Sequence, residues 1–250
     1  MKKIALYNNK GGVGKSTLAV NIAHALAKVD YKVLLIDLDS QNDCSLMLGI
    51  DRNQERKSFY DLINPHSTAK IEECIIEARE NLDLLPNSKY EIIEKEFNNN
   101  AMFLTTLLDE KLAGLEEMGY DYVIFDCSPS RSIINSAILF FIDYIFIPVQ
   151  LEIPAIDGLA TIFDYLEDLR LDFAKIKLII PNMYDSRTNE GKENLKMLEE
   201  SFAGQEIVTS PVYRRIKITE ATKQGKTIFE YDQEAQKQLY PIIERVVEID

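Results

Sequence analysis

The sequence predicts an α/β fold in which a doubly wound, mostly parallel sheet is flanked by helices. Three observations predict it: short, almost wholly apolar segments, longer segments of helical spacing between them, and a glycine-rich turn after the first apolar segment. Apolar strands without polar alternation are typical of a parallel sheet that is covered on both faces. Their alternation with helices indicates crossover connections, which place helices on both faces of the sheet.

The predicted elements follow one another in this alternating order. The first strand is expected at residues 4–7, and the alanine-rich stretch after the glycine turn predicts a helix over 15–29. Apolar runs bounded by charged residues or proline predict strands at 32–37, 82–85, 121–126, 144–148 and 177–181. Helical spacing predicts helices over 101–118, 155–170, 190–202 and 233–247. No linker or repeat divides the chain, so residues 1–250 are expected to form a single domain without an N-terminal helix-turn-helix.

Composition and charge exclude several classes of protein. The chain has 28 basic and 41 acidic residues, and its net charge of −13 disfavours a protein that coats DNA by charge alone. Its three cysteines are odd in number and far apart, which excludes a disulfide framework and indicates a reducing compartment. The longest apolar run, residues 133–149, is interrupted by polar residues, and the N-terminus lacks a signal peptide. We therefore expect a cytoplasmic protein that does not bind membranes.

The loop from Asn9 to Thr17 has the composition of a phosphate-binding loop. Its glycines allow backbone N–H groups to turn inward around phosphate oxygens, and the following helix N-terminus adds a partial positive charge. Lys15 is expected to reach the β- and γ-phosphates, and the Ser16 hydroxyl to ligate Mg²⁺. The expected nucleotide contacts of the loop are Lys10, Gly11, Gly12, Val13, Gly14, Lys15, Ser16 and Thr17. The expected cofactors are ATP and Mg²⁺.

A second lysine at the start of this loop, Lys10, departs from the standard P-loop. Lys15 already serves the phosphates of its own chain, and Lys10 is better placed to reach a nucleotide held by a second subunit. With this lysine the loop resembles that of the deviant Walker A ATPases, and within them the ParA family of partition and positioning ATPases. The resemblance implies that Lys10 is the signature lysine, which acts in trans across a homodimer with ATP sandwiched between its subunits.

Four further motifs, in family order, carry the same resemblance. Residues 35–41 (LIDLDSQ) are similar to the family's D-x-D-P-Q, and residues 126–130 (DCSPS) to its D-x-P-P-S. Residues 182–189 (NMYDSRTN) are similar to T-M-x-D-x-R-T-N, and residues 219–232 to S-E-A…G-K…Y-D. Three prolines of these motifs are replaced here, by Ser40, Ser128 and Thr222, which leaves the loops with more conformational freedom. The resemblance covers nearly the whole chain and places further nucleotide contacts at Asn182 and Pro211.

Three aspartates stand at the ends of two predicted strands. Asp37 and Asp39 follow one strand and Asp126 ends another, so all three are expected at the carboxyl edge of the sheet, where ligands bind. Asp37 and Asp126 are expected to hold the magnesium shell, through water, together with Ser16. By resemblance Asp39 orients or activates the attacking water, which makes Lys10, Lys15 and Asp39 the expected catalytic residues.

One stretch opposes the acidic balance of the chain. Residues 211–226 contain five basic side chains and one acid, Glu220. The family resemblance places non-specific contacts with duplex DNA at Arg187, Arg215 and Lys217. It also implies slow hydrolysis that is stimulated by a partner, either a ParB-like centromere-binding protein or another cargo adaptor, and a nucleoid-associated location.

Several alternatives remain open from the sequence. The same switch could position a protein assembly instead of DNA, or it could be a regulatory binding module without turnover. A reductase or carrier with an iron–sulfur cluster is a third alternative, but Cys44, Cys74 and Cys127 lack metal-ligand spacing and are better explained as buried thiols. The C-terminal segment is amphipathic and acidic, so it is expected to pack on the sheet and not on anionic lipid.

Overall fold

The computed structural model describes residues 1–52, 56–87, 90–97, 100–151 and 155–249. A seven-stranded sheet forms its centre, in the order β3-β4-β2-β5-β1-β6-β7. The strands are β1 (Lys2–Leu6), β2 (Val33–Asp37), β3 (Ile76–Arg79), β4 (Leu82–Leu85), β5 (Tyr122–Asp126), β6 (Tyr144–Gln150) and β7 (Ile176–Asn182). All neighbours are parallel except the pair β3 and β4, which confirms the predicted mostly parallel sheet.

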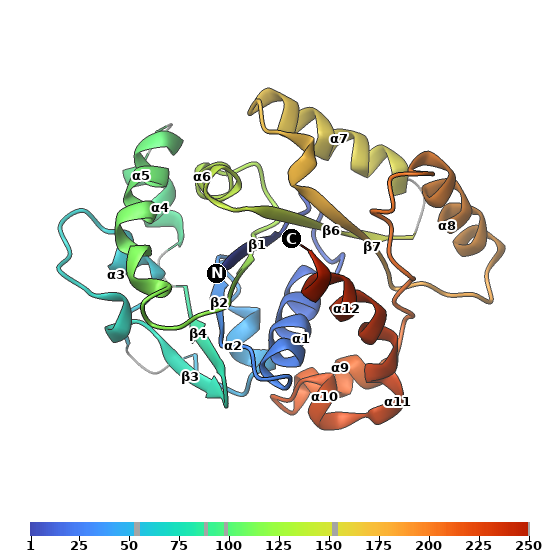
Figure 1. The fold of residues 1–250 in the computed structure, drawn as a ribbon, viewed down its shortest axis with the longest axis horizontal. Coiled ribbons are helices and arrows are strands. Elements are labelled where there is room, and N and C mark those ends of the chain that lie inside the picture. The colour runs from blue at the N-terminus through green and yellow to red at the C-terminus, as the bar shows by residue number, and fades with distance from the viewer. Residues whose placement is uncertain (53–55, 88–89, 98–99, 152–154, 250) are drawn as a thin grey trace.

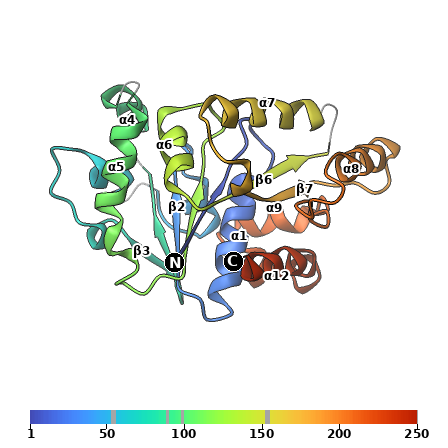
Figure 2. The same ribbon diagram turned by 45° about the horizontal axis from the view of Figure 1, so that its top comes forward.

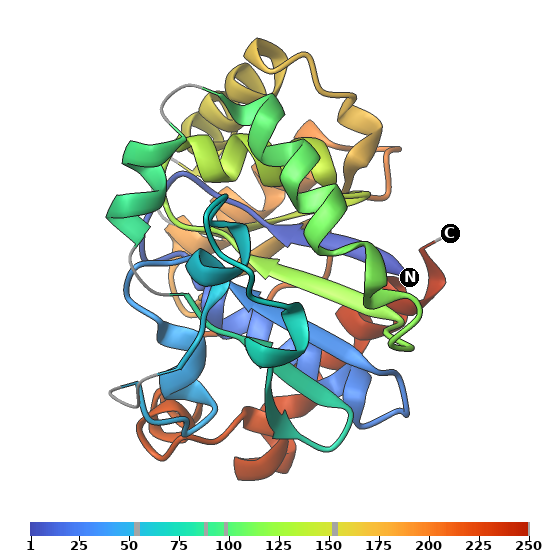
Figure 3. The same ribbon diagram turned by 90° about the vertical axis from the view of Figure 1, so that its left-hand side faces the viewer.

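Helices cover both faces of this sheet. They are α1 (Lys15–Ala27), α2 (Asp43–Met47), α3 (Phe59–Ile63), α4 (Tyr90–Glu96), α5 (Ala101–Lys111), α6 (Ile133–Phe141), α7 (Ala155–Asp168), α8 (Asn189–Ser201), α9 (Ile216–Lys223), α10 (Ile228–Tyr231), α11 (Gln233–Gln236) and α12 (Tyr240–Glu248). Figure 1 shows α6 and α7 on one side of the strands and α1 and α12 on the other. With the view turned by 90°, Figure 3 shows the same two layers, with α5 (green) above the sheet and α1 (blue) below it.

Each face of the sheet has its own apolar core. One core packs β-strand side chains such as Phe125 and Ile147 against α3, α5, α6 and α7. The other packs Ile4, Leu35 and Ile124 against α1, α10 and α12. Because central strands contribute to both cores, strands β2 and β5 are buried along their whole length. This explains their unbroken apolar sequence.

The order of the strands creates a switch point at the carboxyl end of β1. The chain runs from β1 through α1 to β2 on one side, and from β5 through α6 to β6 on the other side of β1. Ligands bind at such switch points in open α/β sheets. The loop after β1, the end of β2 and the end of β5 all lie at this edge.

Both chain termini lie side by side at the edge of the sheet opposite to this switch point (Figure 2). The Lys2 ammonium donates hydrogen bonds to the carbonyls of Val247 and Ile249, which ties β1 to the end of α12. The C-terminal helix packs Ile242 and Val246 into the core beside α1, which confirms that this segment packs on the sheet.

The predicted helices over 233–247 and 101–118 are each interrupted. The first is divided into α11, a 3-10 turn and α12, because Pro241 has no N–H to donate and its ring disturbs the preceding turn. The second ends at Lys111 and continues as a 3-10 turn over Ala113–Leu115, where Gly114 weakens helix propensity. Strand β3 and the short helices α2, α3, α9 and α10 were not predicted, and neither was α6, which is part of the longest apolar run.

Candidate phosphate and magnesium site

The loop between β1 and α1 has the conformation that phosphate binding requires. Gly12 and Gly14 have positive φ values of 75° and 91°, which aim successive N–H groups to one side. Asn182, at the end of β7, donates a hydrogen bond of 2.8 Å from Nδ2 to the Val13 carbonyl. A Cβ atom on Gly14 would lie 2.2 Å from that same nitrogen, so Asn182 and Gly14 together fix the loop.

The two lysines of the loop have different surroundings. Lys15 is 5% exposed, and its Nζ donates to the carbonyl oxygen of Lys10 over 3.2 Å. Burial lowers the pKa of Lys15, whereas the charge of Asp126 raises it. Lys10 itself is exposed. The side chain of Lys15 is therefore enclosed by the site, while that of Lys10 is in contact with solvent at the start of the loop.

Asp37 and Asp126 lie directly beside each other at the carboxyl ends of β2 and β5. The two residues are register partners in the parallel pair, and both are fully buried. Asp37 accepts backbone hydrogen bonds from Asp39 (3.0 Å) and Cys44 (3.1 Å), one on each oxygen. Oδ1 of Asp126 is buried without a hydrogen-bond partner. The two carboxylates, one of which has an oxygen without a hydrogen-bond partner, and the nearby Ser16 hydroxyl form a set of oxygen donors that suits Mg²⁺.

Burial opposes the charge of both carboxylates. It raises the pKa of Asp126 to about 6, although Ser16, Cys44 and Lys15 stabilise the charged form. Burial also raises the pKa of Asp37, and the charge of Asp126 raises it further. The site therefore favours a cation, because a cation offsets the cost of two buried negative charges.

We expect Asp126→Asn to stabilise the nucleotide-free and magnesium-free protein at pH 7 by up to about 3 kcal/mol, at about 1.36 kcal/mol per pKa unit. An unfolded chain releases this proton near the ordinary aspartate pKa of 3.8, and the folded protein holds it to about 6. The stability that this group contributes therefore falls as pH rises through that window. Urea unfolding at pH 7 and pH 4 measures the effect, which should be small at pH 4. The exposed Asp109→Asn is the control, and equal or lower stability of Asp126→Asn at pH 7 would contradict the expectation.

Asp39 lies at the rim of the site and not in the buried pair. Its side chain is partly exposed, and its Oδ1 accepts the backbone N–H of Gln41 over 3.0 Å. The structure thus separates the two aspartates of the same motif: Asp37 is buried at the sheet edge and Asp39 stays accessible to solvent. A water molecule can reach Asp39 without displacing a core side chain.

Cys44 also belongs to this site, although its position in the sequence did not indicate it. Its thiol lies in the first turn of α2 and donates a hydrogen bond of 3.3 Å to Oδ2 of Asp126. Burial and the charges of Asp37 and Asp126 raise its pKa, so the thiol is protonated in the protein without a cation. In the sequence, Cys44 stands seven residues after Asp37. This spacing points to the site only once the short helix α2 is known to turn the chain back toward the sheet edge. Cys74 and Cys127 are also free and buried, as expected.

A cavity of about 280 Å³ borders the loop on the side of α1. It is lined by Thr17, Asn182, Met183, Tyr213, Arg214, Arg215, Ile218 and Thr219. Thr17 and Asn182 were predicted nucleotide contacts, and both line it. Pro211 does not belong to this lining, although its neighbour Val212 hydrogen-bonds to the Pro181 carbonyl and so holds this segment beside β7. The cavity therefore opens beside the first turn of α1, next to the end of β7.

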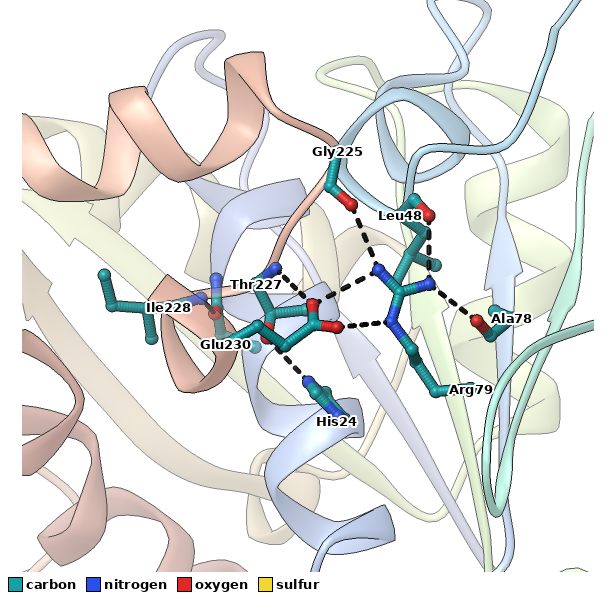
Figure 4. A network of polar contacts seen from close by, with 9 residues as sticks. His24, Leu48, Ala78, Arg79, Gly225, Thr227, Ile228 and Glu230 are labelled. Carbon is teal, nitrogen blue, oxygen red and sulfur yellow. Dashed lines mark hydrogen bonds and ion pairs between the residues drawn. The ribbon is translucent and has the colours of Figure 1, made fainter. Parts of the chain in front are cut away.

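The basic segment, residues 211–226, lies next to this cavity, and the residues that follow it contact α1 and β3. The main-chain N–H of Ile228 donates to Asn21 of α1, and Thr227 contacts His24 of α1 over 2.6 Å. Arg79 joins the Glu230 carboxylate to the carbonyls of Leu48 and Gly225 (Figure 4). Arg79 of β3 therefore links the end of the basic segment to the end of α2, and the residues just after the segment attach it to α1.

Two of the predicted DNA contacts are paired with acids of the same chain. Arg187 binds Asp185 through Nε (2.8 Å) and Nη2 (2.6 Å), and the pair lowers the pKa of Asp185 to about 2. Lys217 binds Glu220 over 2.9 Å. The base of each pair is exposed to solvent, and water and salt weaken ion pairs at such a surface. A phosphate can therefore replace either acid at small cost.

The expected neighbourhood of Arg187 and the basic segment is present. The main chain of Arg214 donates to the Tyr184 carbonyl over 3.0 Å, and Tyr184 forms a bridge with Tyr213. The loop that carries Arg187 therefore runs beside the start of the basic segment. Among the helices described, none is both long and apolar enough to cross a membrane.

Comparison with known sequences finds a family model and relatives that cover most of this chain. The family described as "AAA domain" matches residues 1–180. The chromosome partitioning protein ParA of Caulobacter vibrioides is 31% identical over 236 residues, which cover 93% of this chain and 88% of that protein.

Solved structures of similar fold include partition proteins as well. A plasmid partition protein from Borrelia burgdorferi, solved with AMPPNP, has a TM-score of 0.82 at 25% identity and covers 99% of this chain and 98% of its own. McdA from Cyanothece, in complex with ATP, has a TM-score of 0.84 at 21% identity over 99% of this chain and 96% of its own, and shares the fold.

Proposed function

The chain belongs to the ParA family of P-loop ATPases, and from this premise we propose that it is the ATP-dependent dimerising switch of a DNA partition system. The chain is an ATPase. In the proposed switch, the bound nucleotide controls whether two copies of the chain associate. The observation that carries it is the separation of the two loop lysines, because Lys15 is buried in the site and Lys10 is exposed.

The geometry of the site supports the following hydrolytic roles. Lys15 exchanges its contact with the Lys10 carbonyl for the β- and γ-phosphates, and the loop N–H groups surround their oxygens. Ser16, Asp37 and Asp126 would hold magnesium, which would neutralise phosphate charge and orient the transferred group. Asp39 orients the attacking water from the rim. Because phosphoryl transfer depends mainly on positioning and charge neutralisation, these residues suffice for slow hydrolysis.

Dimerisation is the step that ATP controls. The Lys10 side chain is exposed to solvent, so its ammonium can approach the nucleotide of a second copy. ATP carries more negative charge than ADP at the loop mouth, so it attracts Lys10 of the second copy more strongly. A partner protein of the ParB type, or another cargo adaptor, stimulates hydrolysis and so reverses the association.

Duplex DNA is the proposed ligand of the ATP-bound dimer, and the nucleoid within the cytoplasm is its proposed location. Arg187, Arg215 and Lys217 are exposed and belong to two adjacent segments. A dimer presents this basic surface twice, and screening limits the influence of distant acids to about 8–10 Å. Contacts of this kind bind phosphates without reading sequence.

Positioning of a protein cargo is the second candidate function, and the charge of the chain favours it. The net charge is −13, and Arg187 and Lys217 already have acidic partners in their own chain. An iron–sulfur carrier has less support, because such clusters are held by several thiolates. The one potential metal-binding cluster among the described residues contains a single cysteine, Cys44.

We expect Lys217→Ala to weaken the binding of the ATP-bound protein to all duplex sequences about equally. Each phosphate contact releases counterions, so the log–log slope of affinity against salt should become shallower by about 0.9 for each phosphate that is no longer bound. ATP-driven dimerisation should be unchanged, because the Lys217 ammonium contacts Glu220 and the Tyr231 ring and not the phosphate loop. A salt titration of fluorescent duplex DNA, with ATP, with ADP and without nucleotide, measures these effects.

Lys196→Ala is the matched control, because Lys196 also forms an exposed pair with a glutamate of its own helix, at 3.5 Å. It should leave the DNA affinity and the salt slope unchanged. Absence of DNA binding by the wild type with ATP at low salt, or binding that ignores the nucleotide, would refute the DNA role. The protein-positioning candidate would then stand in its place.

A further inference from the structure

Three buried side chains place different ligand atoms around one point at the edge of the sheet. They are Asp37, Cys44 and Asp126, and one ligand atom from each lies within 4.8 Å of the other two. All three residues are 0% exposed. They come from β2, α2 and β5, so the sheet register and the first turn of α2 hold them in place.

The distance between two of these atoms, one sulfur and one oxygen, is near that of a tetrahedral centre. Zinc ligands lie about 2.3 Å from the metal for sulfur and about 2.0–2.2 Å for oxygen, which gives a sulfur-to-oxygen separation of about 3.6 Å. The Sγ atom of Cys44 lies 3.3 Å from Oδ2 of Asp126. The sulfur of Cys44 and this oxygen of Asp126 are therefore already nearly as far apart as two ligands of one tetrahedral metal ion.

Each carboxylate retains capacity for a further ligand. Oδ1 of Asp126 is buried and has no hydrogen-bond partner, which is costly unless another group binds there. Each oxygen of Asp37 accepts one backbone N–H and keeps a second lone pair. The main-chain N–H of Cys44 holds Asp37 while its thiol contacts Asp126, so one residue aligns both carboxylates.

We propose that Cys44, Asp37 and Asp126 form a site for a thiophilic divalent cation of the Zn²⁺ class, distinct in its ligands from magnesium bound with nucleotide. Mg²⁺ prefers oxygen donors and keeps several of its waters, so it does not recruit a thiol. Zn²⁺ and Co²⁺ accept one sulfur with two oxygens, and a thiolate strengthens their binding. On binding, the S–H bond of Cys44 breaks, the proton leaves to solvent, and an S–metal bond forms without oxidation or reduction.

The two kinds of cation exclude each other at this site. Asp37 and Asp126 serve both, so a cation bound by Cys44 and these carboxylates occupies the oxygens that the water shell of a nucleotide-bound magnesium would contact. A zinc-class cation therefore competes with Mg·ATP. Metal binding of this kind does not depend on DNA binding or dimerisation, since it takes place at the nucleotide-free site.

Cobalt is the probe that tests the site, because thiolate-bound Co²⁺ has a sulfur-to-metal charge-transfer band in the near ultraviolet. Titration of the nucleotide-free, full-length protein with Co²⁺ should produce this band to one equivalent, and Zn²⁺ should then remove it. Cys44→Ala should lose the band and bind Co²⁺ at least about 100-fold more weakly. Cys74→Ala is the matched control, because Cys74 is also buried and free, and it should keep the band.

Cys44→Ser provides a second variant, in which a hydroxyl can keep the hydrogen bond to Asp126. It should fold as the wild type does, as judged by its melting curve without metal, and should also lack the band. A wild type without the band, or a band that persists in Cys44→Ala or Cys44→Ser, would overturn the proposal. Excess Mg·ATP should bleach the wild-type band, and a band that survives would refute the shared use of the carboxylates.

Discussion

Replacement of Lys15 by alanine should weaken the binding of Mg·ATP by at least about 100-fold, the largest effect that we expect from a single substitution. The Lys15 ammonium is buried, and it donates a hydrogen bond to the Lys10 carbonyl. Phosphate is a much better partner for a desolvated ammonium than a neutral carbonyl. Loss of a charge-assisted contact in a buried site costs about 3–5 kcal/mol, and each 1.4 kcal/mol is a factor of ten in affinity.

Calorimetric titration with ATP and magnesium measures this loss. Lys28→Ala is the matched control, because Lys28 follows the same helix at its exposed end and should leave the affinity unchanged. The variant should remain folded, since burial of the ammonium opposes its charge in the nucleotide-free protein. Unchanged ATP affinity in Lys15→Ala would remove the basis for placing the phosphates at this loop.

The strands and the edge of the sheet that carries the site could be predicted from the sequence, because both depend on local patterns. Strands β2 and β5 are buried on both faces, and their unbroken apolar runs end at Asp37 and Asp126. The sequence could not show that these two aspartates are register partners, since strand order depends on long-range packing. The charge of Asp126 adds to the effect of burial in raising the pKa of Asp37, which favours a cation at this place.

Other elements were not predictable for a different reason. The strand at 144–148 was predicted, but the mostly apolar stretch at 133–142 before it, with only Asn135 and Ser136 as polar residues, did not show a clear helical period, so α6 was missed. Helix α2 has only five residues, too few to show a helical period in the sequence, and without this helix Cys44 had no visible relation to the aspartates. The ion pairs of Arg187 and Lys217 lie within three residues in sequence, but the sequence alone did not reveal whether each acid faced its base.

Asp39→Ala should bind ATP, lose hydrolysis by about 100-fold or more, and accumulate as a dimer. The side chain lies at the rim and outside the buried pair of register partners, so nucleotide binding should survive its removal. A positioned base contributes about 10²–10⁴-fold to proton transfer, which sets the size of the kinetic loss. Because hydrolysis is the step that separates the subunits, its loss leaves the ATP-bound dimer as the final state.

Sedimentation velocity with ATP, with ADP and without nucleotide decides whether this dimer forms. Asp43→Ala is the control, because Asp43 begins the next helix and should retain hydrolysis. Lys10→Ala, added to Asp39→Ala, should return the protein to monomer at saturating ATP, since the exposed ammonium would no longer reach the second nucleotide. A double variant that stays dimeric would remove Lys10 from the interface. A monomeric Asp39→Ala at saturating ATP, or a wild type equally dimeric without nucleotide, would show that ATP does not control association through this loop.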